Sequence, residues 1–132
     1  MLIDKPVGWT SHDVVAAVRR RLGQRSVGHT GTLDPFATGL LVVMVGRATR
    51  LARFIEASSK KYEASIQFGT ATDTDDGTGE VIREFVPEQW PDRARMEAAL
   101  ESLVGAQQQR PPAYSAKHVA GKRSHELERA GV

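Results

Sequence analysis

The spacing of hydrophobic residues predicts that the chain begins with a strand followed by a helix. The strand covers Leu2–Lys5, and Pro6 ends it. In the next stretch, apolar residues recur at the spacing of one helix face, at Val14, Val15, Val18 and Leu22. Thr10 or Ser11 is the expected N-cap of this helix, and Gly23 is its expected end.

The most apolar run of the chain, Leu40–Val45, directly follows a polar segment rich in glycine, Gly28–Gly39. The run predicts a buried strand, and the segment predicts a loop fixed to the start of that strand. Within the loop, Asp34 precedes Pro35, which favours an extended backbone at the aspartate. Asp and Pro are also ordinary turn residues, so local chemistry leaves Asp34 open as either a turn cap or a reactive group.

The later segments include some with the alternating pattern of strands and others with the three-to-four-residue spacing of helices. Lys61–Phe68 alternates strictly and predicts a half-buried strand with Tyr62 at its start. The other expected elements are a short helix over 48–57, a polar loop over 70–79, a strand over 80–86, a helix over 93–104, an extended stretch over 107–114, a small hairpin over 117–123 turning at Gly121, and a final helix capped by Ser124. This order predicts an α+β fold: a mixed, mostly antiparallel sheet with flanking helices, in one domain over residues 1–132.

Composition removes several kinds of chemistry. The 132 residues include no cysteine, which excludes disulfides, thiolate nucleophiles and cysteine-ligated zinc. Asp73, Asp75 and Asp76 resemble the start of a calcium loop, but Gly77 stands where an oxygen ligand is needed. The residues therefore predict no metal site in this acidic loop. No apolar run is long enough for a membrane span and the N-terminus has no signal-peptide layout, so we expect a cytoplasmic protein with no membrane partner. The sequence leaves the oligomeric state open, and a monomer is the expectation.

Positive charge is clustered although the net charge is only +2. The clusters are Arg19, Arg20 and Arg21 with Arg25, then Lys60 and Lys61, then Lys117, His118, Lys122 and Arg123. Such clusters suit a polyanion such as nucleic acid, although each cluster alone is also typical of a solvated surface.

The reactive groups that remain are one carboxylate in a stiff loop and one tyrosine at the start of a predicted strand. A carboxylate such as Asp34 acts as a nucleophile or base at neutral pH without special tuning. Tyr62 is able to stack on a flat ring, but a tyrosine on an apolar face is most often a core residue with its hydroxyl paired. The residues therefore allow an enzyme acting on a nucleobase without requiring one.

Four segments in order resemble the TruB-type tRNA pseudouridine synthases. They read GHTGTLDPFATGLL at 28–41, DKPVGWTS at 4–11, KKYEA at 60–64 with FGTATDTD at 68–75, and QRPPAYSAK at 109–117 with GKR at 121–123. The resemblance implies the pseudouridine synthase fold, here incomplete: residues 1–132 match the N-terminal part of the catalytic domain, with its remainder and the C-terminal RNA-binding domain absent. His125 stands where the family pattern has tyrosine.

The resemblance also implies a reaction. Members isomerise a T-loop uridine of tRNA, at position fifty-five, to pseudouridine on a flipped-out base, without cofactor or metal. Asp34 then matches the catalytic aspartate, Tyr62 the residue that stacks on the uracil, and His29 the residue that contacts the flipped nucleotide. Attack on the uracil ring, attack on C1′ and proton abstraction all stay open for Asp34.

Two further sets of residues follow from the same resemblance. Residues expected to support the active-site loop are Lys5, Pro6, Gly28, Thr30, Gly31, Leu33 and Pro35. Residues expected to contact the tRNA T-arm are Arg19, Arg20, Lys61, Asp73, Lys117, Lys122 and Arg123. The alternatives are a fragment that binds a T-loop without turning it over, and a structural domain with a solvated basic surface.

Overall fold

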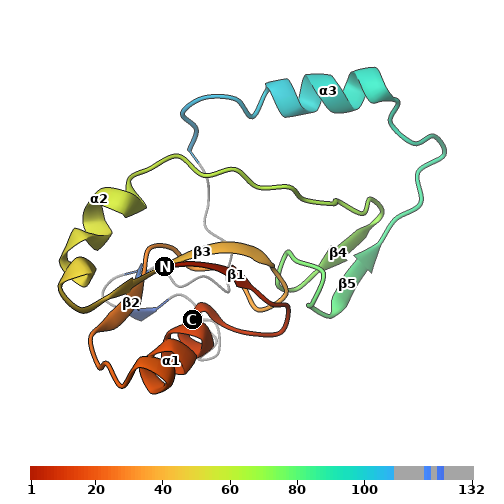
Figure 1. Cartoon of the computed structure of the whole chain (residues 1–132). Coiled ribbons are helices and arrows are strands. Elements are labelled where there is room, and N and C mark those ends of the chain that lie inside the picture. The colour runs from red at the N-terminus through yellow and green to blue at the C-terminus, as the bar shows by residue number, and fades with distance from the viewer. Residues whose placement is uncertain (109–117, 120–121, 124–132) are drawn as a thin grey trace. The chain divides into compact units, whose positions relative to one another are not determined.

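The computed structural model describes residues 1–108, 118–119 and 122–123. They belong to two compact units, Met1–Ala64 and Ser65–Val132 (Figure 1). Helices and strands are mixed in the described residues, and every described strand pair is antiparallel. The predicted α+β class is therefore confirmed.

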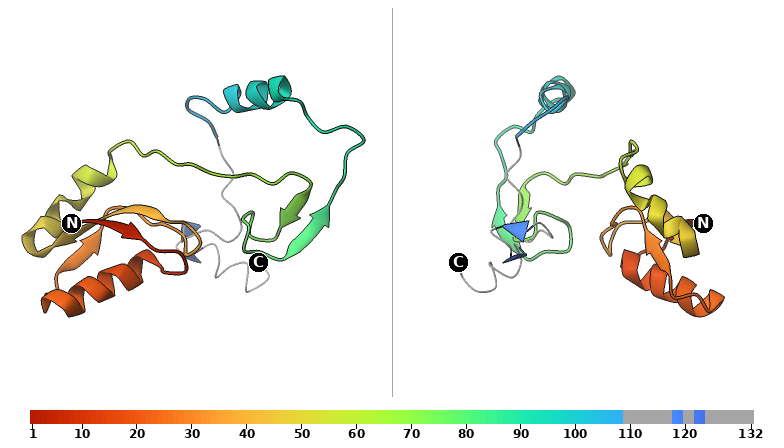
Figure 2. Two further views of the ribbon diagram at one scale, coloured as in Figure 1. Left: turned by 45° about the vertical axis from the view of Figure 1, so that its right-hand side comes forward. Right: turned by 90° about the vertical axis from the view of Figure 1, so that its left-hand side faces the viewer.

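The N-terminal unit is a three-stranded sheet with helix α1 against one face (Figure 2). Its elements are β1 (Leu2–Lys5), α1 (Ser11–Leu22), β2 (Val27–His29), β3 (Gly39–Val45), a 3-10 helix η1 (Gly46–Leu51) and α2 (Ala52–Glu56). The strand order is β1-β3-β2, so β3 is central and pairs with both neighbours. The predicted strands at 2–5 and 40–45 are confirmed, and the predicted short helix is divided between η1 and α2.

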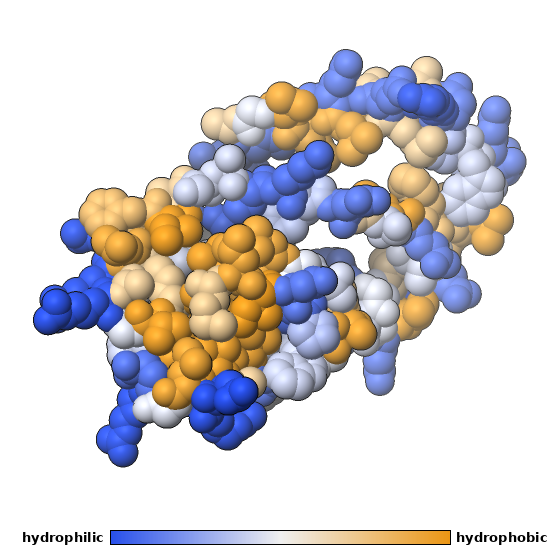
Figure 3. Space-filling view, in the orientation of Figure 1, coloured by the Kyte–Doolittle hydropathy of each residue, from blue (hydrophilic) through white to orange (hydrophobic). Residues whose placement is uncertain are grey.

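The core lies between α1 and one face of this sheet. Val14, Val15 and Val18 of α1 pack with Leu41 and Val43 of β3. Because side chains alternate along a strand, the opposite face carries Leu2 and Leu40, which are 74% and 65% exposed. Hydrophobic residues gather over β1 and β3 in Figure 3. Each fully buried Val or Leu contributes about 1.5–3 kcal/mol, so the helix is held mainly by its valine stripe.

Both predicted ends of the first helix are confirmed. Thr10 is the N-cap: its hydroxyl oxygen accepts a hydrogen bond from the Asp13 backbone N–H at 3.1 Å, and the Asp13 carboxylate accepts one from the Thr10 N–H at 2.9 Å. This reciprocal pair is a capping box. At the other end, Gly23 has φ 57°, a left-handed conformation that is costly for residues with a Cβ.

The capping box predicts a pH-dependent contribution to stability. Hydrogen bonds from the Thr10 hydroxyl and then its backbone N–H lower the pKa of Asp13 below its usual value of 3.8. A lowered folded-state pKa stabilises the fold above the unfolded pKa, and this contribution is lost as pH falls through the folded value. Asp13→Asn is therefore expected to unfold at a lower temperature than wild type at pH 7, with the gap shrinking below about pH 4.

Thermal unfolding between pH 2.5 and pH 7 tests this expectation. Asp4→Asn is the matched control, because Asp4 is exposed and its side chain makes no hydrogen bond within the described residues. If the difference in unfolding temperature between wild type and Asp13→Asn stays constant over the whole pH range, the Asp13 carboxylate contributes nothing through its charge.

The second unit contains two hairpins and one helix among its described residues. Its elements are β4 (Thr70–Thr72), β5 (Val81–Glu84), α3 (Arg93–Glu101), β6 (His118–Val119) and β7 (Lys122–Arg123). β4 pairs with β5, and β6 pairs with β7. β4 covers residues 70–72, which were expected in the polar loop, so the predicted loop is wrong at its start, because these residues pair with β5. The expected strand over 80–86 is confirmed as β5, and β6 with β7 confirms the small hairpin, although Lys117 and the predicted turn residue Gly121 lie outside the described residues. The final predicted helix and most of 107–114 also lie outside them.

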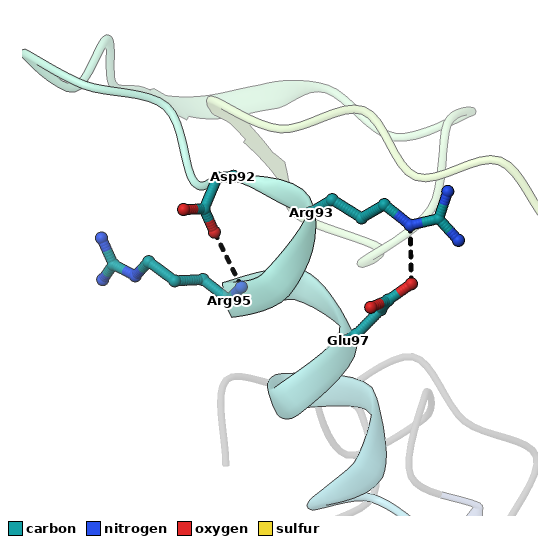
Figure 4. A network of polar contacts seen from close by, with 4 residues as sticks. All are labelled: Asp92, Arg93, Arg95 and Glu97. Atoms are coloured by element: carbon teal, nitrogen blue, oxygen red, sulfur yellow. Dashed lines mark hydrogen bonds and ion pairs between the residues drawn. The ribbon is translucent and has the colours of Figure 1, made fainter.

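Helix α3 is shorter than its hydrophobic stripe predicted. Figure 4 shows its start, where the Asp92 carboxylate accepts a hydrogen bond from the Arg95 N–H at 2.8 Å, and Arg93 forms an ion pair with Glu97 at 2.7 Å. Such exposed pairs four residues apart stabilise a helix by only about 0.3–0.5 kcal/mol. The helix ends at Glu101, and Leu103 and Val104 beyond it are exposed, because no partner within the described residues buries that stripe.

Gly69 is required at the start of the β4–β5 hairpin. Its φ is 89°, and a Cβ there would lie 2.8 Å from the Phe85 carbonyl oxygen and 2.9 Å from the Trp90 ring. Gly69→Ala is expected to destabilise this hairpin by about 2–4 kcal/mol, because backbone strain and overpacking add. Gly77→Ala is the control, since a Cβ at Gly77 has no neighbour within 4 Å. Amide hydrogen exchange on β5 measures the loss of protection, and equal exchange in both variants would contradict the expectation.

Two other predictions are wrong in detail: the start of the loop at Gly28, and the strand over Lys61–Phe68. Gly28 and His29 do not lie in the loop: they form most of β2, because they pair with Met44 and Val43 of β3. The segment Lys61–Phe68 is not a strand, and Tyr62 and Phe68 are 68% and 52% exposed. Alternation decides which side chains share a face, but a strand also needs a partner edge, and the described residues give this segment none. Within the described part of the chain, no helix has the length and apolar character to cross a membrane.

Candidate active site

The loop between β2 and β3 presents Asp34, and its N-terminal half is fixed to helix α1. The Leu33 N–H donates a hydrogen bond to the Ser11 hydroxyl oxygen at 2.9 Å, and the Ser11 hydroxyl donates to the Leu33 carbonyl oxygen at 3.3 Å. Ser11 is buried, so this pair is shielded from water. The residue before Asp34 is therefore held at both of its backbone polar groups.

The residue after Asp34 is held by the segment that follows β1. The Pro35 carbonyl oxygen accepts hydrogen bonds from the Gly8 N–H at 2.7 Å and from the Lys5 ammonium at 3.4 Å. Lys5 is completely buried, and its ammonium also donates to the Trp9 carbonyl at 2.6 Å and to the Pro6 carbonyl at 3.1 Å. A single buried cation thus joins the 6–9 turn to the Asp34 loop.

Asp34 itself is exposed on this fixed backbone. Its carbonyl oxygen accepts a hydrogen bond from the Ala37 N–H at 3.1 Å, which closes a turn. Within the described residues, its carboxylate makes no hydrogen bond or ion pair. The turn interpretation is therefore correct for the backbone, while the side chain does not serve as its cap. The arrangement presents an accessible carboxylate at a defined position, as a catalytic group requires.

The start of the loop packs tightly against the sheet. The Thr30 N–H donates to the Val42 carbonyl oxygen at 3.1 Å, and Thr30 is buried. Gly31 has φ 150°, and a Cβ there would lie 3.8 Å from Cε of Lys60. His29 is partly buried, and its Nδ1 atom is buried with no hydrogen-bond partner among the described residues. A buried polar atom without a partner is unusual and calls for a specific explanation.

The structure shows no contact that joins Tyr62 to the Asp34 loop within the described residues. Tyr62 and Lys61 are exposed, and no hydrogen bond joins either side chain to the loop within the described residues. Lys60, two residues before Tyr62, passes Gly31, so this segment begins beside the loop. Pro6 and Gly28 lie within the scaffold, Pro6 in the turn after β1 and Gly28 in β2.

The residues expected to contact RNA differ in what their side chains do. Arg19 donates to the Val27 carbonyl oxygen at 2.8 Å and so fixes the start of β2, whereas Arg20 is exposed. The Asp73 carboxylate accepts a hydrogen bond from the Glu80 N–H at 2.8 Å, inside the acidic turn. In the same turn, hydrogen bonds from the Thr78 hydroxyl and N–H lower the pKa of Asp76 below its usual value. Lys117 lies outside the described residues, as do the side chains of Lys122 and Arg123.

Sequence reasoning missed one residue that fixes the loop. Ser11 was expected only as a possible N-cap, but it occupies the first position of α1 and binds Leu33. The sequence around Ser11 does not predict this contact, because it joins residues that are far apart in the chain. The only signal available was a serine placed directly after an already sufficient N-cap, Thr10.

Comparison with known proteins defines the class. Residues 19–132 match the N-terminal domain of the TruB family of pseudouridylate synthases. The chain therefore belongs to the TruB family.

Individual relatives agree with this assignment. The chain is 51% identical over 131 residues to a tRNA pseudouridine synthase B of Thermobifida fusca (strain YX), with 99% of this chain and 44% of the relative covered. It is 46% identical over 132 residues to that of Bacillus subtilis (strain 168), with all of this chain and 43% of the relative covered. The chain thus spans less than half the length of these relatives.

A solved structure supports the fold. The protein in a Cbf5-Nop10-Gar1 complex matches with a TM-score of 0.53 and 28% identity, over 87% of this chain and 30% of that one.

Proposed function

We propose that this chain is the catalytic part of a tRNA pseudouridine synthase that isomerises the T-loop uridine at position fifty-five, with Asp34 as its catalytic carboxylate. One observation carries the proposal: Leu33 and Pro35 are both anchored, while the Asp34 carboxylate between them is exposed. The names of the relatives support the reaction class.

The reaction needs a carboxylate that is ionised, accessible and fixed. The bond between C1′ and N1 breaks, the uracil turns, C5 bonds to C1′, the hydrogen on C5 leaves as a proton, and N1 takes up a proton from water. Atoms balance within the substrate, so neither an oxidant nor a cofactor is required. An anchored aspartate starts its attack, or its proton abstraction, without first losing conformational freedom. The target nucleotide has to leave its stack to reach such a residue.

Two side chains are proposed to hold the flipped nucleotide. His29 is partly exposed at the end of β2, where the loop that presents Asp34 begins, so the accessible part of its ring is placed to contact the flipped nucleotide. Tyr62 is exposed, so its ring is accessible for stacking on the uracil. The buried Lys5 ammonium keeps the backbone of the loop in place while this happens.

Release of tritium from tRNA labelled at uridine C5 tests the proposal. C5 loses its hydrogen when it becomes the new glycosidic carbon, so each turnover releases one labelled proton. We expect release by the chain extended to the length of its relatives. Release by residues 1–132 alone would show that these residues suffice. No release from either protein would overturn the proposal.

A second candidate function is binding of a T-loop without turnover. It is favoured by the observation that the chain covers only 44% of a relative's length, so groups of the complete site can lie elsewhere. The two candidates are distinguished by tRNA binding without tritium release in residues 1–132, combined with release in the extended chain.

A further inference from the structure

The solvent-facing side of α1 carries a stripe of residues that the reaction does not use. Asp13, Ala16 and Arg20 follow one another at spacings of three and four residues, which places them on one side of the helix, and Trp9 lies just before its N-cap, Thr10. With Gly8, they line an open hollow of about 310 Å³. The hollow lies over Ala16, because its side chain is smaller than those of Trp9, Asp13 and Arg20 around it.

A second hollow continues the first toward the end of the helix. It has about 420 Å³ and is lined by Arg19, Arg20, Gly23, Gln24 and Arg25. Arg20 lines both hollows, so they adjoin at this residue, and we call the two hollows together the groove along α1. The twelve residues of α1 make this groove about 18 Å long. Its near end is Gly8, whose N–H binds the Pro35 carbonyl beside Asp34.

The charges along the groove change from one end to the other. Arg20 and Arg25 are exposed, and within the described residues their guanidinium groups make no hydrogen bond or ion pair, whereas Arg19 is bound to Val27. The C-terminal end of α1 carries about half a negative charge from its free carbonyl groups, which repels an anion. The positive charges of the two arginines are larger than this partial charge. At the other end, Asp13 is negative and disfavours a phosphate. Trp9 beside it is 43% exposed and offers a flat apolar ring.

We propose that this groove binds the RNA strand that leaves the reacting nucleotide, with a nucleobase stacked on Trp9 and backbone phosphates on Arg20 and Arg25. The inference rests on the proposed function for the identity of the RNA. An aromatic ring combined with arginines spaced along a groove is the arrangement by which proteins follow a single strand without reading its sequence. The groove begins at the anchor of the Asp34 loop, so it extends the catalytic site along the helix.

The experiment measures tRNA binding and turnover with three variants of the chain extended to the length of its relatives. Arg20→Gln with Arg25→Gln removes the phosphate contacts, and Trp9→Leu removes the stacking ring. Arg47→Gln with Arg50→Gln is the control for loss of charge, because these two exposed arginines lie in the same unit outside the groove. Filter binding at several salt concentrations gives the affinity, and tritium release gives kcat and KM.

We expect the Arg20 and Arg25 double variant to bind at least about tenfold more weakly, with the slope of log affinity against log salt reduced by about 1.4, since each phosphate contact on a single strand contributes about 0.7. Trp9→Leu is expected to weaken binding by roughly tenfold with the slope unchanged, because stacking releases no counterion. In both variants KM rises and kcat stays at the wild-type value.

The outcomes separate this inference from the proposed function. Wild-type turnover with an unchanged salt slope in the double variant, or with a change no larger than in the control, overturns the groove and leaves the proposed function standing. Absence of turnover in wild type, with tRNA affinity still dependent on Arg20, Arg25 and Trp9, overturns the proposed function and supports the groove as an RNA-binding site.

Discussion

Asp34→Asn is expected to reduce pseudouridine formation by about a thousandfold or more, the loss typical of removing a catalytic base or nucleophile. Asparagine has nearly the same size as aspartate and fits the same backbone, but it carries no negative charge. It is therefore a poor nucleophile and no base at neutral pH. The measurement is tritium release from tRNA labelled at uridine C5, in the chain extended to the length of its relatives.

The structure predicts that this substitution leaves the fold intact. The carboxylate is exposed and makes no hydrogen bond within the described residues, while the anchors of the loop use the backbone of Leu33 and Pro35. The unfolding temperature and the affinity for tRNA should both stay at wild-type values. Asp4→Asn, at another exposed aspartate of the same unit, is the matched control and should keep full activity. Turnover by Asp34→Asn near the wild-type rate would remove Asp34 as the catalytic group.

Lys5→Met is expected to lower the free energy of unfolding by about 2–3 kcal/mol and kcat by roughly a hundredfold. Methionine fills a similar volume but donates no hydrogen bond, so the carbonyl groups of Pro6, Trp9 and Pro35 lose the ammonium. Removing the buried charge relieves its own desolvation, which limits the cost in stability. The loss of rate has a separate cause: Pro35 keeps only its bond from Gly8, and a small displacement of Asp34 is enough to slow the reaction.

Lys60→Met is the matched control for this substitution. The Lys60 ammonium also donates to backbone carbonyls, those of Glu56 and Ser58, but Lys60 is exposed and water replaces it there. Urea unfolding and single-turnover tritium release should show a loss for Lys5→Met that is absent for Lys60→Met. If Lys5→Met loses stability but turns over at the wild-type rate, the buried cation supports the fold without positioning the aspartate.

The sequence determined the elements whose signals are local. The valine spacing, a cap at Thr10 or Ser11 and the glycine at position 23 together predicted α1, because a helix is built from contacts three and four residues apart. The apolar run before Gly46 predicted β3, and the motif around Asp34 identified the family. Each of these signals is complete within a short stretch of chain.

Tertiary structure alone decided the features that depend on residues far apart in the chain. Gly28 and His29 belong to β2, because the edge of β3 pairs with them. The segment Lys61–Phe68 forms no strand although its polar and apolar residues alternate strictly. Tertiary structure also buried Lys5 under the 6–9 turn and joined Ser11 to Leu33. The sequence determined that an aspartate stands in a stiff loop, but only packing across the sheet decided what holds that loop, because hydrogen-bond partners distant in sequence leave no periodic signal.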